Sequence, residues 1–146
     1  MAPLIVLIAA FVVFRAIGFI SPYFADWHLA LRAALGIMFL LTASAHWGKR
    51  RPYLIRMVPD GVGDPATWVT LTGLAELFIA FTLQIPRLAP LSAGIAIVML
   101  CCLFPANIKA ARENLTILNQ PVPHLVPRLL IQLLFIAALL ATFWHF

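Results

Sequence analysis

The sequence predicts an all-α integral membrane protein whose five transmembrane helices form a single bundle. Hydrophobic residues make up 64% of the 146 residues and charged residues 10%, whereas soluble domains are about 45–50% apolar and about 25% charged. The apolar residues also gather into five stretches of 17 to 21 residues, and about 20 helical residues cross the ~30 Å hydrocarbon layer. We expect one transmembrane domain over residues 1–146, with spans at 3–20, 27–47, 66–85, 88–104 and 125–144.

The apolar stretches are expected to be helices, because no ten-residue block alternates apolar and polar residues as a membrane barrel requires. Proline marks several span ends: Ser21-Pro22 follows the first, Asp64-Pro65 precedes the third, and Phe104-Pro105 is expected to end or kink the fourth. The tryptophans give independent support, since indoles prefer the membrane interface. They fall at span ends, at Trp27, Trp47, Trp68 and Trp144.

The two long loops are too short to be domains. Residues 54–58 are amphipathic enough to lie on lipid headgroups. Residues 106–118 could extend the fourth helix beyond the membrane, after which Pro121, Pro123 and Pro127 predict an extended link to the fifth.

Basic residues predict the orientation of the bundle. Segment 48–65 has four Lys/Arg and segment 105–124 has two, whereas the loops on the opposite side have only Arg87. Lys and Arg are enriched in cytoplasmic loops. We therefore expect the N-terminus inside and the C-terminus outside.

Composition and spacing argue against several function classes. The net charge of +5 does not indicate nucleic-acid binding, because the basic residues form no contiguous patch on a polar surface. Cys101 and Cys102 are adjacent, which is neither metal-site nor redox spacing. No cluster of His, Cys, Asp and Glu, no histidine pair at matching depth and no catalytic triad is visible. We expect no metal and no haem, and the sequence leans against an enzyme.

Glu76 is the most informative polar residue, because a charge at mid-span costs about 2.5–3.5 kcal/mol if unpaired. It lies ten residues into the third span, and Thr72 and Ala80 share its helix face. Two interpretations remain open. Glu76 is either a protonatable group in a ligand or proton pathway, or a buried hydrogen bond or ion pair that locks helices together.

Depth along the helices suggests partners for Glu76. At about 1.5 Å per residue, Glu76 lies ~15 Å, Gln132 ~10 Å and Arg128 ~5 Å below the cytoplasmic surface. Arg128 and Gln132 also share a face. Arg32 and Arg15 offer a second solution from the outer side. His46 is a candidate ligand or proton carrier, although an interfacial residue is the commoner role.

Several motifs, in this order and spacing, resemble those of DoxX-like small membrane proteins over residues 31–141. The matching pieces are His46-Trp47 at the end of 43–47, IRMVP at 55–59, LTGLAEL at 71–77, Pro86-Arg87, FPAN at 104–107 and RLLIQ at 128–132. The resemblance implies a four-helix core with one extra N-terminal helix, in a bacterial inner membrane. It also implies association with membrane oxidoreductase systems, including quinone-coupled thiosulfate oxidation, although a distant animal relative acts in receptor assembly. Its motif positions include Glu76, His46, Pro59, Asn107, Arg128 and Gln132.

These observations predict an accessory membrane protein with one polar pocket inside the bundle. The pocket would hold a quinone or lipid, with Glu76, Arg128 and Gln132 as its polar floor and His46, Asn107 and Thr72 nearby. The alternative is an assembly factor or structural subunit that packs against another membrane protein or a second copy. Small-residue faces at Ser92/Ala96 and Ala137/Ala141 suit that role, but they equally suit packing within the bundle.

Overall fold

The computed structural model describes residues 2–118, 120–121 and 124–143. These residues form a bundle of helices with one small hairpin, which confirms that the fold is all-α. The long helices are α1 (Ala2–Ile17), α2 (Trp27–Ser44), α4 (Pro65–Thr82), α5 (Ala89–Arg112) and α6 (Leu125–Ala141). The short elements are η1 (Pro22–Ala25), α3 (Arg51–Met57), β1 (Thr116–Ile117) and β2 (Gln120–Pro121).

Each long helix falls on an expected span, but their lengths differ. In the described part of the chain, α2, α4 and α5 have 18, 18 and 24 residues and are long and apolar enough to cross a membrane. The apolar helices α1 and α6 are shorter, at 16 and 17 residues. Length and composition therefore indicate a membrane protein with three candidate spans.

The loops agree with expectation in one detail and differ from it in another. Helix α5 continues past Pro105 to Arg112, which is the extension of the fourth helix that residues 106–118 were expected to allow. The link to α6 contains an antiparallel pair, Ile117 opposite Gln120, and Pro127 lies inside α6. Pro123 and Trp144, which we placed in the link and at the last span end, lie outside the described residues.

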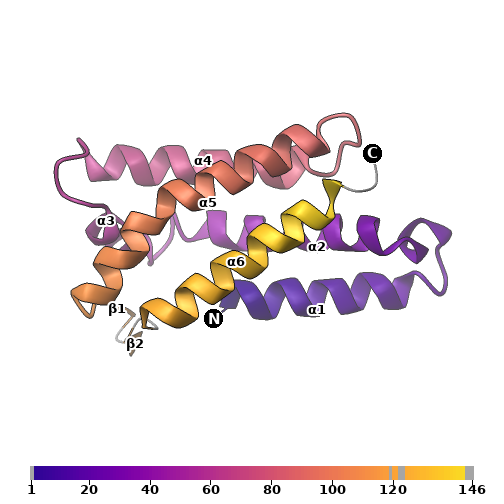
Figure 1. Cartoon of the computed structure of the whole chain (residues 1–146), viewed down its shortest axis with the longest axis horizontal. Helices are drawn as coiled ribbons and strands as arrows, with labels where there is room; N and C mark the ends of the chain where they lie inside the picture. Colours follow the sequence, from indigo (N-terminus) through magenta and orange to yellow (C-terminus); the bar gives the residue numbers. More distant parts are fainter. Residues whose placement is uncertain (1, 119, 122–123, 144–146) are drawn as a thin grey trace.

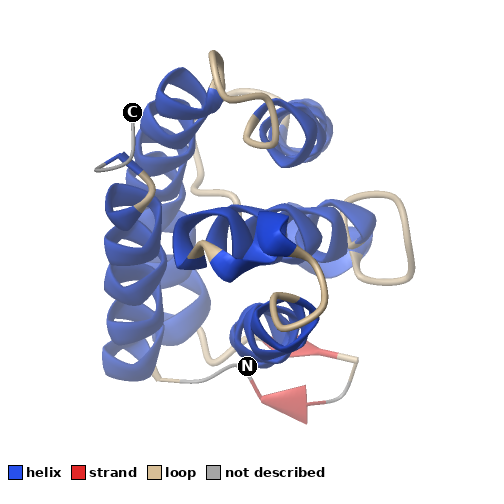
Figure 2. Cartoon of the chain, turned by 90° about the vertical axis from the view of Figure 1, so that its right-hand side faces the viewer, coloured by secondary structure: helices blue, strands red, loops and turns tan. Residues whose placement is uncertain are grey.

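The chain passes back and forth along one axis, so its connections gather at two ends (Figure 1). One end contains the connections 45–64 and 113–124 and is here called the basic end. The other contains the connections 18–26 and 83–88 and is called the turn end. Figure 2 looks along the long axis of the bundle, with some helices seen end-on, others running across the view, and the hairpin at the edge.

The core is formed by apolar side chains from several helices, and small residues bring α5 close to its neighbours. Ser92 and Ala96 are buried within this chain, whereas Ala137 on α6 is exposed. The outer faces are also apolar, as expected for a surface that faces lipid rather than water. Exposed examples on α1, α4, α5 and α6 are Ile5, Val12, Phe81, Leu91, Val98 and Leu130.

Candidate ligand-binding site

A cavity of about 970 Å³ lies at the basic end and is lined by α1 to α6 and the hairpin. Ligand pockets in proteins are typically about 300–1,000 Å³, mostly apolar, with a few placed polar groups. This cavity has that character, since leucine, valine, methionine and proline make up half of its lining residues and alanine, isoleucine, tryptophan and cysteine add to its apolar wall. Its polar and charged lining residues are Thr42, His46, Arg50, Thr72, Glu76, Asn107 and Arg128.

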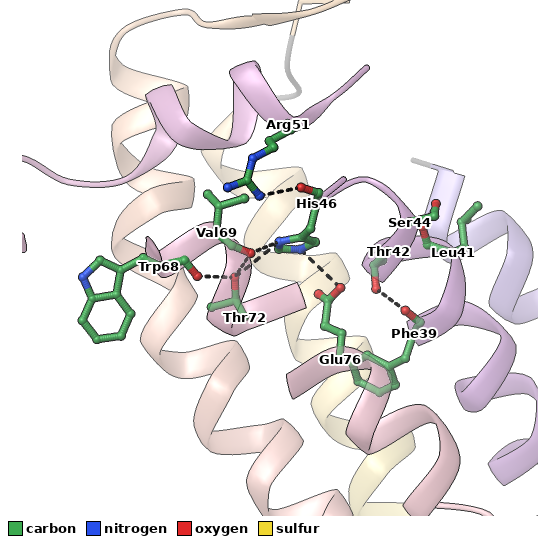
Figure 3. Close-up of polar contacts among 10 residues, drawn as sticks. All are labelled: Phe39, Leu41, Thr42, Ser44, His46, Arg51, Trp68, Val69, Thr72 and Glu76. Carbon is green, nitrogen blue, oxygen red and sulfur yellow. Dashed lines mark hydrogen bonds and ion pairs between the residues drawn. The ribbon is translucent and has the colours of Figure 1, made fainter. Parts of the chain in front are cut away.

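His46 and Glu76 form a buried pair on the cavity wall (Figure 3). Their exposed fractions are 8% and 7%, and His46 Nε2 lies 3.3 Å from Glu76 Oε2. The other ring nitrogen, Nδ1, lies 2.6 Å from the Val69 carbonyl oxygen. Because a carbonyl can only accept, Nδ1 must carry a proton. Nε2 therefore faces the carboxyl group, and the neutral pair holds one proton, on either Oε2 or Nε2.

The contact between His46 and Glu76 has an ion-pair distance without good hydrogen-bond alignment. Oε2 of Glu76 is a buried atom with no well-formed hydrogen bond among the described residues. A pair of this kind is sensitive to small movements of the ring, because its attraction is electrostatic while its directional bond is incomplete.

The fold brings His46 onto α4 through a close backbone approach. After α2 ends at Ser44, the chain turns, and Gly73 faces the turn: a Cβ on Gly73 would lie 2.7 Å from His46 Cβ. Helix carbonyls point toward the C-terminus, whereas side chains tilt toward the N-terminus. The Val69 carbonyl and the Glu76 carboxyl group therefore converge on one imidazole, although they are seven residues apart.

Arg51 fixes the backbone on which His46 sits. Its Nη1 donates to the His46 carbonyl at 2.8 Å, and its Nη2 donates to Thr70 Oγ1 at 2.9 Å and to the Ala66 carbonyl at 3.1 Å. The first turn of α4 is thus tied directly to the His46 segment.

Asp64 caps the start of α4. Its Oδ2 accepts from the Thr67 hydroxyl at 2.6 Å and from the Thr67 backbone N–H at 2.8 Å. These bonds, the hydroxyl first, hold the pKa of the Asp64 carboxyl below its ordinary value, because they favour the ionised form. The cap fixes the helix end that presents Val69 and Gly73 to His46.

A second polar group joins α5 and α6. Arg128 Nη1 donates to Asn107 Oδ1 at 2.6 Å, and Asn107 Nδ2 donates to Gln132 Oε1 at 3.4 Å. Gln132 Nε2 in turn donates to the Leu100 carbonyl at 2.9 Å. All three bonds run in the same direction, so the buried Gln132 orients Asn107, and Asn107 orients the guanidinium group.

Most residues predicted for the site meet at this cavity. His46, Thr72, Glu76, Asn107 and Arg128 line it, and Gln132 supports Asn107 from behind. The Thr72 hydroxyl donates to the Trp68 carbonyl at 2.8 Å and lies 3.4 Å from His46 Nδ1.

The two arginines predicted as outer-side partners of Glu76 bind backbone carbonyl groups instead. Arg32 Nε donates to the Leu83 carbonyl at 3.0 Å, and Arg15 Nη1 donates to the Phe24 carbonyl at 3.1 Å, both at the turn end. Glu76 instead pairs with His46.

Sequence reasoning missed the residues that position the His46–Glu76 pair. Gly73 lets the His46 turn lie close to α4, and Arg51 ties that turn to α4. Sequence reasoning also missed Lys109, whose Nζ donates to the Val58 carbonyl at 3.0 Å and to Asp60 Oδ1 at 2.9 Å. Val58, Pro59 and Val62 of this loop line the cavity and are here called its loop wall. The two bonds of Lys109 hold the loop wall against α5. In the described part of the chain, no three His, Cys, Asp or Glu side chains are grouped to hold a metal ion.

Comparison with known proteins places the chain by family alone. No curated protein and no solved structure matches it. The model of a family described as a domain of unknown function (DUF8561) matches residues 35–142, a range that includes every lining residue of the cavity except Ala2 and Pro3 on α1. The match covers most of the sequence, so this chain belongs to the DUF8561 family.

Proposed function

We propose that this protein is an accessory integral membrane protein with five membrane-crossing helices, whose cavity binds a small amphipathic molecule such as a quinone. In this proposal it serves a membrane oxidoreductase system, as the DoxX-like resemblance implies. The N-terminus and the basic end face the cytoplasm of a bacterium.

The outer faces of the shorter helices support five spans. Helix α6 is about 26 Å long, close to the ~30 Å hydrocarbon thickness. Large apolar residues on both short helices point away from the bundle, among them Ile8 and Val13 on α1 and Leu130 and Leu133 on α6. Surfaces of this kind are suited to lipid.

The cavity is the observation on which the proposed function depends. Its extensive apolar wall suits a hydrophobic ring or tail, and its polar groups include the His46–Glu76 pair and the Arg128–Asn107 pair. A quinone has two carbonyl acceptors separated by a ring. The Arg128 guanidinium group and a protonated Nε2 are donors of the type that such acceptors need.

A binding experiment with a short-tailed quinone tests this proposal. The protein in lipid nanodiscs is titrated with decylubiquinone, and the bound fraction is measured by native mass spectrometry. We expect Glu76→Gln to weaken binding by about tenfold, the equivalent of one hydrogen bond. Glu113→Gln is the matched control, because Glu113 is an exposed carboxylate that does not line the cavity. Equal affinities in wild type and Glu76→Gln would contradict the pocket proposal.

The same measurement on protein extracted gently from its own membrane tests the assembly-factor alternative. Of the small residues that could seat a partner helix, Ala137 on α6 is exposed, whereas Ser92 and Ala96 are buried inside this chain. A stoichiometric protein companion without a small ligand would favour assembly over ligand binding.

A further inference from the structure

We propose that the cavity selects an amphiphile with an acidic head group, a carboxylate or a phosphate, and that Arg128 binds this head group. The inference rests on the proposed function, because it names the ligand class of the same cavity. The proposed ligand differs from a neutral quinone in its polar end, which must carry a negative charge.

The charges that line the cavity favour an anion. The described lining residues include two arginines, Arg50 and Arg128, and one carboxylate, Glu76. Glu76 lies 3.3 Å from His46, and this pair is neutral as a unit when it holds one proton between Oε2 and Nε2. Among the described lining residues, positive charge therefore exceeds negative charge. In surroundings that are mostly apolar, electrostatic attraction is stronger than it is in water.

Arg128 is also held in a fixed orientation. One of its partners, Asn107, is a neutral amide, and this bond orients the guanidinium group without adding a negative charge beside it. Behind it, Gln132 is 8% exposed and is bound to the Leu100 carbonyl. A planar guanidinium group binds carboxylate and phosphate oxygens better than it binds a single carbonyl, because the bonds are charge-assisted and can form in pairs.

The rest of the cavity suits the apolar part of such a molecule. Met99, Leu100 and Leu103 on α5 line the cavity together with residues of the loop wall. Arg50, which is exposed, also lines it and adds positive charge where an acidic amphiphile would enter from solvent or headgroups. An alkyl chain along the apolar wall with its acid on Arg128 uses both parts of the cavity.

Protection of Cys102 from maleimide labelling gives a readout that does not depend on activity. Cys102 lines the cavity, and Cys101→Ser removes the adjacent thiol, which does not. The protein is placed in nanodiscs of neutral lipid and labelled in the presence of palmitate, hexadecanol, lysophosphatidate, inorganic phosphate or decylubiquinone. We expect palmitate to bind about tenfold more tightly than hexadecanol, which has the same chain length and a neutral head group. Protection by lysophosphatidate and not by inorganic phosphate would show that the acid must be attached to an apolar chain.

Asn107→Asp tests the role of Arg128 without removing it. The isosteric carboxylate would lie where Oδ1 now accepts from Nη1 at 2.6 Å, so it would neutralise the guanidinium group and reduce the preference for palmitate over hexadecanol by about tenfold. Arg112→Gln is the matched control, a basic residue of α5 that does not line the cavity, and it should leave the preference unchanged.

The outcomes separate the two proposals. Equal protection by palmitate and hexadecanol, or an unchanged preference in Asn107→Asp, would overturn the acidic-ligand inference. Protection by decylubiquinone without protection by palmitate would overturn this inference and leave the proposed function standing. Failure of every amphiphile to protect Cys102 would remove both.

Discussion

The two ends of the bundle use the same kinds of polar side chain in different ways. At the turn end, Arg32 donates to the carbonyl of Leu83, and Gln84 Nε2 donates to the carbonyl of Arg32 at 3.0 Å. These bonds tie α2 directly to the end of α4. At the basic end, Arg128 and His46 instead have partners that line a cavity of about 970 Å³. A buried arginine in an apolar helix is therefore not a functional signal by itself, and what distinguishes the basic end is the space beside the polar groups.

The largest effect should come from removing one member of the buried pair at the basic end. His46→Leu leaves the Glu76 carboxyl group without the imidazole, and we expect a loss of about 3 kcal/mol in the free energy of unfolding. Replacing both residues, in His46→Leu/Glu76→Leu, should recover most of this loss, because no uncompensated polar group remains. Unfolding in mixed detergent micelles measures both variants. A double variant less stable than the single one would show that the pair itself stabilises the fold.

A smaller effect is expected from closing the space between the His46 turn and α4. A methyl group at Gly73 would lie 2.7 Å from His46 Cβ and 2.8 Å from Trp47 Cη2, so Gly73→Ala should cost about 2 kcal/mol and weaken ligand binding. Gly94→Ala is the matched control, because a Cβ there meets nothing within 4 Å. It should be neutral or stabilising by up to about 1 kcal/mol, since alanine favours helix. Equal stabilities of the two variants would argue against the close approach.

The turn end should affect stability without affecting the ligand. Arg32→Gln removes the bond from Nε to the Leu83 carbonyl, and we expect a loss of about 1.5 kcal/mol. The protection of Cys102 by an amphiphile should not change, because Arg32 does not line the cavity. A large change in protection would mean that the two ends are coupled.

The smallest effect concerns the cap of α4 and its dependence on pH. The folded-state pKa of Asp64 is lowered by Thr67, so its contribution is complete above its ordinary pKa of 3.8 and disappears as the pH falls through the lower folded value. Asp64→Asn should therefore lower the Tm slightly at neutral pH and converge with wild type in acid. Thermal unfolding at a series of pH values measures this, and parallel Tm curves would contradict it.

The helices were predictable from the sequence because lipid imposes a length and an apolar composition on each span. The positions of Arg128, Gln132 and Glu76 along their helix axes also followed from helix rise, since all three lie in regular helices. The contacts of these three residues could not be predicted, because a position along a helix does not show which other helix lies beside it. Asn107 could be linked to Arg128 only once α5 was known to continue past Pro105 beside α6. The pairing of His46 with Glu76 depends on a turn that folds back at Gly73, and no periodicity in the sequence encodes that approach.

The composition of the cavity wall has a consequence for biosynthesis. The lining begins at Ala2 and ends at Arg128, so most of the chain must leave the ribosome before the wall is complete. The pair between α4 and the His46 turn can form once α4 has been inserted, whereas Arg128 arrives with the last helix. Under the proposed function, the nascent protein should therefore form its helices before it becomes able to bind, and a chain that terminates before α6 should lack Arg128 and retain no ligand.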